Sequence, residues 1–381
     1  MSQQTIHIEE VQSRWQLDDF VKLPRTIYSD CRYYVPDLER EVRDTFTRGK
    51  NASLEVCPAQ AFVAYDSENR PVGRIAAIIN HRANEKWGTC DVRFSHLEFV
   101  DDRAVLKALI DAAAAWGRKH GMKRIIGPMG FTDFDKEGML VEDFEKTGSF
   151  ISIYNHAYYP RHLEALGFKK EVDWLSVAID IPEELPERYR RSASLARQLY
   201  GLRVLSLSRK QLKQSYARRV FELLNQAYEP LFGFVAFTDS QIDEFVDQYI
   251  MSIDPALIPI VIDKEDNVVG AAVTMTSISH ALQQSGGRVL PWGWFHLLKA
   301  LKWHREPVAE LMLICVRPDY QGLGVNALLF EDLLPKFNKL GVKKAETGPQ
   351  LEDNIKELSQ WKPLNPQFTK RRRCYSRQLE G

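Results

Sequence analysis

Hydrophobic and polar positions along this chain form two kinds of pattern, one typical of β-hairpins and one typical of amphipathic helices. Both patterns occur in each half of the chain, in the same order. Segments 60–80 and 258–278 each hold two apolar runs around a polar turn, a pattern typical of β-hairpins. Residues 102–121 and 325–341 place apolar residues three and four apart, which predicts amphipathic helices that end at glycines. Each half is therefore expected to run strand, helices, hairpin, strand, helix, strand.

The repeated order predicts a duplicated chain. A strand over 174–181 closes the first half, and PEELPERYRRS (182–192), rich in proline and charge, is expected to be a linker. A chain of 381 residues is too long for one ordinary core. We therefore predict an α/β fold with two domains, at residues 1–182 and 190–381, related by duplication.

Composition narrows the function classes. Hydrophobic residues make up 44% and charged residues 27%, with a net charge of zero, so no nucleic acid partner is expected. The five cysteines form no CxxC pair, and no Cys/His cluster has metal-ligand spacing, so no metal is expected. The N-terminus lacks a signal-peptide pattern and no apolar run nears the roughly 20 residues of a membrane span. A cytoplasmic protein is expected.

The segment AELMLICVRPDYQGLGVNALLFEDLL (309–334) combines a buried strand, a glycine loop and an apolar helix. A helix start that follows such a loop presents free backbone N–H groups and a positive dipole, which suit phosphate or pyrophosphate. The alternative is a tight turn without a ligand.

Within this segment, VRPDYQGLGVN resembles the acyl-CoA loop of the GNAT superfamily of N-acyltransferases, whose pattern is [QR]-x-x-G-x-[GA]. Gln321 and Gly324 match its first two fixed positions, whereas Asn326 stands where the family has a small residue. The resemblance implies two tandem GNAT-like domains, each a mixed twisted sheet flanked by helices, with acyl-CoA as co-substrate. It also implies that the strand before the loop splays to admit the pantetheine arm, and that the CoA pyrophosphate binds the loop backbone of Gln321, Gly322, Leu323, Gly324, Val325 and Asn326.

The first half lacks this loop. At the matching place, HLEFVDDRAVLKALIDAA carries Asp101 and Asp102 where backbone donors would meet phosphate. Because these carboxylates would repel the ligand, the first domain is expected to have lost CoA binding and to serve a structural or acceptor-binding role.

Acyl transfer from a thioester to an amine needs a neutral amine and a stabilised oxyanion. The resemblance implies Glu310, eleven residues ahead of Gln321, as the general base. It implies an oxyanion donor among the backbone N–H groups of Ile314, Cys315 and Val316. A Glu310 exposed at the strand edge is the alternative, and the Cys315 thiol is expected to pack rather than to act as a nucleophile.

The leaving thiolate often receives a proton as well, in this family usually from a tyrosine on the helix after the fifth strand. In LEDNIKELSQWKPLNP, Asn354 fits the start of that motif, which implies a cofactor contact. Trp361 stands at the tyrosine position and cannot act as an acid. Water must then supply the proton, or another residue does.

The first half offers YNHAYYPRHLEALGF, in the segment where GNAT folds line their acceptor pocket. His156, Tyr158 and Tyr159 are therefore candidate catalytic residues. The alternative is that these aromatic side chains belong to the core.

Two further segments bear on partners. LPWGWFHLLKALKWHRE (290–306) would give a helix an apolar, tryptophan-rich face with a basic edge, which indicates contact with a membrane surface or an acyl-chain tunnel. A core helix is the alternative. The basic segment 369–379 is expected to be a solvated edge strand. The alternative is that it attracts the 3′-phosphate of CoA or anionic lipid.

Together these features predict N-acyl transfer from acyl-CoA to a small-molecule or lipid amine, with peripheral contact at the inner membrane face. The architecture and the tryptophan-rich helix also resemble bacterial proteins linked to N-acylation of sphingoid bases in ceramide synthesis. The alternatives are a Fem-type aminoacyl-tRNA-dependent transferase and a non-catalytic acyl-CoA sensor; Trp361 and Asn326 favour the sensor.

Overall fold

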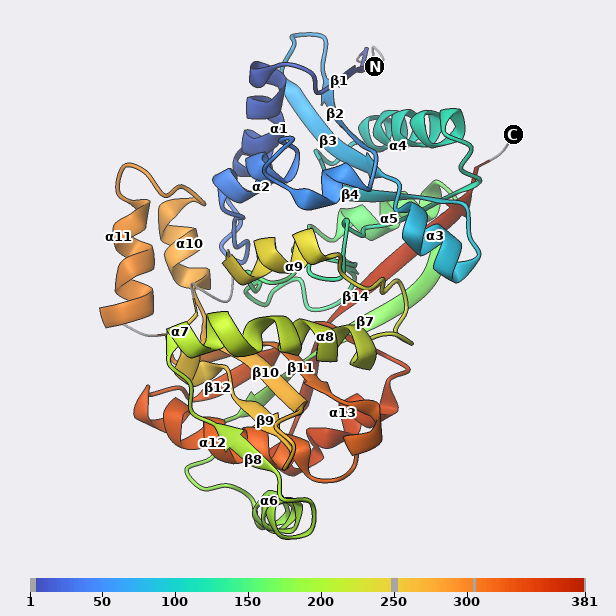
Figure 1. The fold of residues 1–381 in the computed structure, drawn as a ribbon. Helices are drawn as coiled ribbons and strands as arrows, with labels where there is room; N and C mark the ends of the chain where they lie inside the picture. Colours follow the sequence, from blue (N-terminus) through green and yellow to red (C-terminus); the bar gives the residue numbers. More distant parts are fainter. Residues whose placement is uncertain (1–4, 248–252, 304–305, 380–381) are drawn as a thin grey trace. The chain divides into compact units, whose positions relative to one another are not determined.

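The computed structural model describes residues 5–247, 253–303 and 306–379. The chain forms two compact units, drawn with their elements labelled in Figure 1. Unit 1 comprises residues 1–175, 279–297 and 370–381, and unit 2 comprises residues 176–278 and 298–369. A functional division of the chain at residues 182 to 190 stays a prediction.

Unit 1 is built mainly from the first half of the chain. Its strands are β1 (His7–Glu10), β2 (Ala59–Tyr65), β3 (Pro71–Ile78), β4 (Asp91–Phe99), β5 (Arg124–Gly127) and β6 (Met139–Leu140), together with the ends of β7 (Lys169–Asp180) and β14 (Gln367–Gln378) that lie in this unit. Its helices are α1 (Arg14–Ile27), α2 (Glu39–Thr45), α3 (His81–Trp87), α4 (Arg103–Lys119), α5 (Tyr158–Ala165), α10 (Ser279–Ser285) and most of α11 (Gly293–Leu298).

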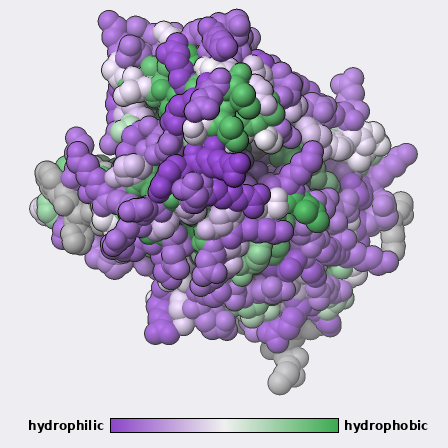
Figure 2. Space-filling view, turned by 90° about the horizontal axis from the view of Figure 1, so that it is seen from below, coloured by the Kyte–Doolittle hydropathy of each residue, from purple (hydrophilic) through white to green (hydrophobic). Residues whose placement is uncertain are grey.

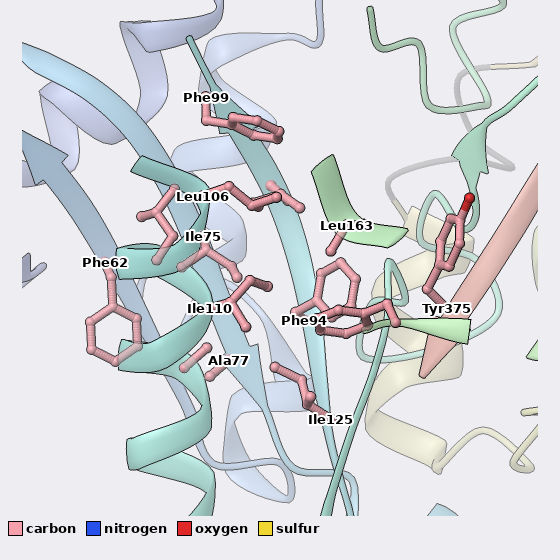
Figure 3. Close-up of a cluster of buried hydrophobic side chains, with 14 of the residues drawn as sticks. Phe62, Ile75, Ala77, Phe94, Phe99, Leu106, Ile110, Ile125, Leu163 and Tyr375 are labelled. Carbon is pink, nitrogen blue, oxygen red and sulfur yellow. The ribbon is translucent and has the colours of Figure 1, made fainter. Parts of the chain in front are cut away.

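The sheet of unit 1 buries side chains on both faces, because successive residues of a strand point to opposite faces. On β2, Phe62 packs in the cluster that contains the apolar side of α4, whereas Val63 packs with α1. Figure 3 shows the α4 side of this core, where Leu106 and Ile110 of the helix lie over Ile75 and Phe94 of the strands. The periodic helix expected over 102–121 is α4, and Asp102 is its N-cap.

Unit 2 repeats this arrangement. Its strands are β8 (Arg203–Leu205), β9 (Ile260–Ile262), β10 (Val268–Thr276), β11 (Val308–Val316), β12 (Lys344–Thr347) and β13 (Gln350–Leu351), with the end of β7. Its helices are α6 (Glu187–Tyr200), α7 (Arg209–Gln211), α8 (Ala217–Ala227), α9 (Asp239–Phe245), α12 (Val325–Lys339) and α13 (Ile355–Gln360). Helix α12 packs over β8 to β11, and α8 packs over β10 and β11.

The strands of the two units follow the same pairing pattern within one continuous sheet. Strands β1 to β4 are antiparallel, β4 and β5 are parallel, and β14 then pairs antiparallel with β5. In unit 2, β8 to β11 are antiparallel, β11 and β12 are parallel, and residues 178–180 of β7 pair antiparallel with β12. Each sheet is thus completed by the strand that ends the other half of the chain.

Three expectations are corrected. The segment expected to be a linker already contains the start of α6 at Glu187, because no side chain from there to Tyr200 interrupts a helix. The basic segment 369–379 is an interior strand rather than a solvated edge, since β14 pairs with β5 and Arg372 is buried. The helix expected over 290–306 begins at Gly293, and its residues 304 and 305 lie outside the described residues.

Candidate functional site

Strand β11 departs from its neighbour β12 halfway along its length. Its pairing with β10 continues to Val316 and carries Met312 as an extra residue, which is a β-bulge. Its pairing with β12 runs only from Val308 to Leu311, after which the N–H of Gly348 donates to the carbonyl of Leu311 at 3.0 Å. The segment 312–316 therefore lies along an edge that β12 has left.

Backbone groups point into this open edge at alternate residues. Ala272 lies opposite Ile314 but donates its N–H to Pro259 on the other side, so this pair exchanges no backbone hydrogen bonds. Ile314 consequently directs its N–H and C=O away from β10, and the hydroxyl of Tyr228 donates to that carbonyl at 3.1 Å. By the same alternation Val316 faces the open edge, whereas Cys315 turns its backbone toward β10.

Glu310 lies on the paired part of β11, opposite Glu346 of β12. Its side chain is only 3% exposed, and its carboxylate accepts a hydrogen bond from the Ser277 hydroxyl at 2.9 Å. The alternative of a solvent-exposed strand-edge glutamate is therefore wrong. A role for Glu310 as general base stays a prediction.

The loop after β11 leads to a helix start without a side-chain cap. Gly322 has φ +80° and Gly324, the N-cap of α12, has φ +88°, both in the region that favours glycine. A Cβ atom at Gly324 would lie 2.7 Å from the carbonyl oxygen of Ser192 in α6, whereas one at Gly322 would meet nothing within 4 Å. Packing thus explains Gly324, while Gly322 stands in open space beside an uncapped helix.

Two further residues of the predicted cofactor site meet around α13. The side chain of Asn326, in the first turn of α12, donates from Nδ2 to Oε1 of Gln360 at 2.7 Å, which leaves its buried Oδ1 without a partner among the described residues. Asn354 caps α13 by accepting from the N–H of Glu357 at 3.3 Å. In the structure, Asn326 therefore links α12 to α13, and Asn354 caps α13.

Trp361 belongs to the core rather than to the open edge. It is 1% exposed, its ring packs edge-on against Phe330 at 5.4 Å, and its Nε1 donates to Oε1 of Gln350 at 3.1 Å. The position expected for a tyrosine acid is therefore filled by a structural indole.

Sequence reasoning missed Glu357, which lies one helical turn before Trp361. Nε2 of Gln350 donates to its carboxylate at 3.3 Å. Burial raises the pKa of Glu357 to about 7, against a smaller opposing effect of the Gln360 amide. The charge of the same carboxyl contributes, after burial, to the raised pKa of the Cys315 thiol. The signal available in the sequence was its four-residue spacing from Trp361.

In unit 1, β4 shows the same geometry as β11, with a bulge and a parallel neighbour that stops pairing early. The backbone groups beyond that point, however, are hydrogen-bonded to side chains. Strand β4 has a bulge at His96 and Leu97, and β5 pairs with it only as far as Arg93. Beyond that point, the Phe99 carbonyl accepts from the Tyr158 hydroxyl at 2.6 Å, and the Phe99 N–H donates to the Tyr159 oxygen at 3.1 Å. The backbone N–H and C=O of Phe99 are thus already hydrogen-bonded to side chains of unit 1.

Tyr159 also joins a buried polar cluster. Oε2 of Glu98 accepts hydrogen bonds from the hydroxyls of Tyr28 at 2.6 Å and Tyr159 at 2.7 Å, and Arg74 lies 3.9 Å from Oε1. Burial raises the pKa of both Glu98 and Tyr159. The ring of His156 lies 4.8 Å from that of Tyr28.

The structure therefore gathers His156, Tyr158 and Tyr159 in unit 1, where Tyr159 belongs to the hydrophobic core cluster. Glu310 and the glycine loop lie in unit 2. A catalytic role for the three aromatic residues stays a prediction, and their visible contacts are structural.

No helix within residues 5–247, 253–303 and 306–379 is long and apolar enough to cross a membrane. Over the same ranges, no group of three or more His, Cys, Asp or Glu side chains could hold a metal ion. Figure 2 shows one face of the molecule, which is largely hydrophilic with scattered hydrophobic patches.

Comparison with known proteins concerns the fold and a segment of the second half of the chain. The acetyltransferase (GNAT) family model matches residues 217–357. Protein YghO of Escherichia coli (strain K12) is 26% identical over 370 residues, which cover 95% of this chain and 93% of that protein. A bacterial ceramide synthase of Caulobacter vibrioides is 27% identical over 310 residues, 80% of this chain and 79% of its own.

Solved structures share the fold along the whole chain. A tandem GNAT protein from the clavulanic acid biosynthesis pathway has a TM-score of 0.57 at 13% identity, with 99% of both chains covered. A GCN5-related N-acetyltransferase from Sphaerobacter thermophilus has a TM-score of 0.53 at 11% identity, covering 99% of this chain and 96% of its own.

Proposed function

We propose that this chain, which has a tandem GNAT fold and carries a GNAT acetyltransferase domain over residues 217–357, transfers an acyl group from acyl-CoA to an amine. The observation that carries the proposal is the adjacency, in one unit, of the open edge of β11 and the uncapped start of α12. An extended pantetheine arm needs backbone partners along a strand, and a pyrophosphate needs free N–H groups at a helix start.

Each predicted step has a residue in unit 2. The backbone N–H of Ile314 or Val316 would bind the thioester oxygen as negative charge develops there. Glu310 would accept a proton from the attacking amine, directly or through water, because its carboxylate is buried on the same strand. The glycine loop would hold the pyrophosphate and fix the thioester in register with the open edge.

For the acceptor, we propose a lipid amine of the sphingoid-base class. Support comes from the relative that is itself called a bacterial ceramide synthase, since ceramide is an N-acylated sphingoid base. A long-chain acyl-CoA is then the proposed donor.

An exposed apolar segment supports contact with a membrane that would hold such substrates. Leu290 and Trp292 are 74% and 73% exposed, and Trp294 and Phe295 are each 45% exposed. Arg288 precedes them and is also exposed. Aromatic and basic side chains in one short segment favour the interface of an anionic membrane over water.

The first test measures thermal stability with CoA, acetyl-CoA and palmitoyl-CoA, followed by release of free CoA thiol with sphinganine as the amine. A ligand at 100 times its Kd stabilises a protein by about 2.7 kcal/mol, which is readily seen as a shift in Tm. We expect palmitoyl-CoA to give the largest shift and sphinganine to release thiol. If no thioester shifts the Tm, the proposal is wrong.

The non-catalytic acyl-CoA sensor is a second candidate, and the indole at position 361 favours it. Binding of palmitoyl-CoA without thiol release on any amine would support it. Sedimentation with anionic and neutral vesicles, on wild type and Trp292→Ser, tests the membrane contact separately. Loss of binding in the variant is the expected result.

A further inference from the structure

We propose that Tyr228 donates the proton to the departing CoA thiolate, in place of the tyrosine that this chain lacks at position 361. The inference rests on the proposed acyl transfer and assigns a further residue to the same site. It follows from one contact, the hydrogen bond that the Tyr228 hydroxyl donates to the carbonyl of Ile314 at 3.1 Å. Both residues belong to unit 2.

Tyr228 lies at the end of the helix that covers this part of the sheet. It is the C-cap of α8, and its N–H donates to the carbonyl of Leu224 at 2.9 Å. Helix α8 packs over β10 and β11. The ring of Tyr228 lies edge-on to that of Phe234, whose side chain is fully buried, with 5.9 Å between the ring centroids. Backbone and ring are thus held from the α8 side, and the hydroxyl extends to the backbone of β11.

The carbonyl that Tyr228 reaches belongs to the open edge of β11. Strand β12 pairs with β11 only as far as Leu311, and Ile314 directs its N–H and C=O away from β10. The same Ile314 N–H is a proposed donor to the thioester oxygen. The thioester sulfur is bonded to the carbon that carries this oxygen, so a thioester bound there brings its sulfur close to the Ile314 backbone. A hydroxyl that is hydrogen-bonded to this residue is therefore within reach of the sulfur.

The structure of the pantetheine arm explains how the hydroxyl becomes available to the sulfur. In CoA, an amide nitrogen, a short ethylene link and the sulfur follow one another, so an N–H donor precedes the thioester. This N–H is a second donor for the Ile314 carbonyl, which has two lone pairs. The hydroxyl hydrogen of Tyr228 can then turn about the C–O bond toward the sulfur, while the ring and the oxygen stay in place.

A phenol suits this proton transfer better than the thiol beside it does. An ordinary tyrosine has a pKa of about 10, so its hydroxyl carries a proton throughout the neutral range. The Cys315 sulfur, on the next residue of β11, lies 3.7 Å from the carbonyl oxygen of Ala271 in β10. Burial raises the pKa of the Cys315 thiol to about 12, which makes it a weaker acid than a phenol. Tyr228 therefore brings an available proton to the open edge, and Cys315 does not.

Atoms and electrons balance in this step. The amine nitrogen forms a bond to the thioester carbon, and the tetrahedral intermediate then breaks its C–S bond. The electron pair of that bond goes to sulfur, which takes the hydroxyl proton of Tyr228 and leaves as the thiol of CoA. The phenolate recovers a proton from solvent, and the proton lost by the amine goes to Glu310 and then to solvent.

The test compares wild type with Tyr228→Phe in steady-state acyl transfer from palmitoyl-CoA to sphinganine, with Tyr216→Phe as the matched control. Tyr216 is a partly buried tyrosine of the same unit, and its hydroxyl donates to Asp266 at 3.2 Å. Each substitution keeps the ring, so we expect both variants to retain a Tm near that of wild type. For Tyr228→Phe we expect kcat to fall at least tenfold, with the Kd for palmitoyl-CoA within twofold of wild type. Tyr216→Phe should keep both values.

The pH profile separates a proton donor from a structural tyrosine. In wild type, kcat should decline as the pH approaches about 10, where a tyrosine loses its proton. Tyr228→Phe should lose this decline, because its residual transfer relies on water, whereas Tyr216→Phe should keep it.

Other results would overturn the inference. A kcat within threefold of wild type and an unchanged pH profile in Tyr228→Phe would mean that water or another group protonates the thiolate. Equal losses of kcat in both variants would mean a structural effect. Weaker binding of palmitoyl-CoA by Tyr228→Phe, with an unchanged kcat, would make the hydroxyl a binding contact only. If wild type binds no thioester, the proposed function fails first, and that failure is visible before any variant is made.

Discussion

The two units begin corresponding helices in opposite ways. In unit 1, the carboxylate of Asp102 caps α4 by accepting from the N–H of Ala104 at 2.7 Å. In unit 2, α12 begins at Gly324 with no side-chain cap, after a loop in which Gly322 faces open space. A capped start has already used a donor and carries a negative charge, whereas an uncapped start leaves donors for an anion.

The strands before these helices differ in the same sense. Strands β4 and β11 each carry a bulge, and each extends beyond the last residue that pairs with its parallel neighbour, β5 or β12. In unit 1, two tyrosine side chains bind both backbone groups of Phe99. In unit 2, the N–H of Ile314 points into the open edge. The duplicated fold thus supplies an unpaired strand edge twice, and local side chains decide whether its backbone groups already have partners.

The largest expected effect comes from copying the acidic loop into unit 2. Gly322→Asp adds a carboxylate in open space at a backbone conformation that Asp and Asn tolerate. Repulsion between this carboxylate and the pyrophosphate should weaken palmitoyl-CoA binding at least a hundredfold, roughly 3 kcal/mol. Calorimetric titration measures it. Gly322→Asn, similar in shape and neutral, should stay within about tenfold of wild type; equal losses in both variants would contradict a charge effect.

Glu310→Gln should lower kcat about a hundredfold without weakening CoA binding. The amide can still accept the hydrogen bond from Ser277, so the fold should persist, but it cannot take a proton. Ser277→Ala is the control for loss of that contact alone. A kcat for Glu310→Gln within threefold of wild type would exclude the general-base role.

Tyr159→Phe should destabilise the protein by about 1–3 kcal/mol, because buried Glu98 loses a donor and the N–H of Phe99 loses its acceptor. Urea denaturation measures this loss, and Tyr158→Phe should cost less because its side chain is only partly buried. We expect kcat per folded molecule to be unchanged. A hundredfold fall in kcat with an intact fold would support the catalytic role expected from the sequence.

Acid should weaken unit 1 through His96. Burial, and then the charge of Arg74, lower the pKa of this imidazole from 6.5 to about 3. The unfolded chain therefore binds the extra proton first as pH falls, so the free energy of unfolding decreases below about pH 6.5 and levels off near pH 3. At pH 5 the loss should be about 2 kcal/mol, measured by urea denaturation at several pH values. His96→Asn, which suits the positive φ, should give a flatter profile.

The smallest effect concerns the cap itself. Asp102→Ala should cost about 1 kcal/mol of stability, while Asp102→Asn, which can still cap α4, should cost less. Neither should change CoA affinity. A marked gain or loss of CoA binding in Asp102→Ala would show that unit 1 also meets the cofactor.

Sequence reasoning anticipated much of the fold and only part of the site. The predicted fold class, two tandem GNAT-like domains, is confirmed, as are the two hairpins, the strand 308–316 and the helix that follows the loop. These features rest on local patterns of burial and on glycines. The prediction failed at α6, where prolines and charges at residues 182–186 suggested a longer linker than the chain has. It also missed Glu357, because neither its burial nor its neighbours are visible in a string of residues.

The sequence by itself determined what depends on neighbours along the chain: helix and strand periods, the cap at Asp102, and a glycine loop between a strand and a helix. The tertiary structure alone decided what depends on distant segments. It placed the last strand of each half in the sheet of the other unit and turned a basic segment into an interior strand. It also removed the Glu357 carboxyl of α13 from much of the solvent, and this desolvation raises its pKa to about 7. Burial arises from contacts between remote residues, so its consequences for proton transfer appear only in the folded chain.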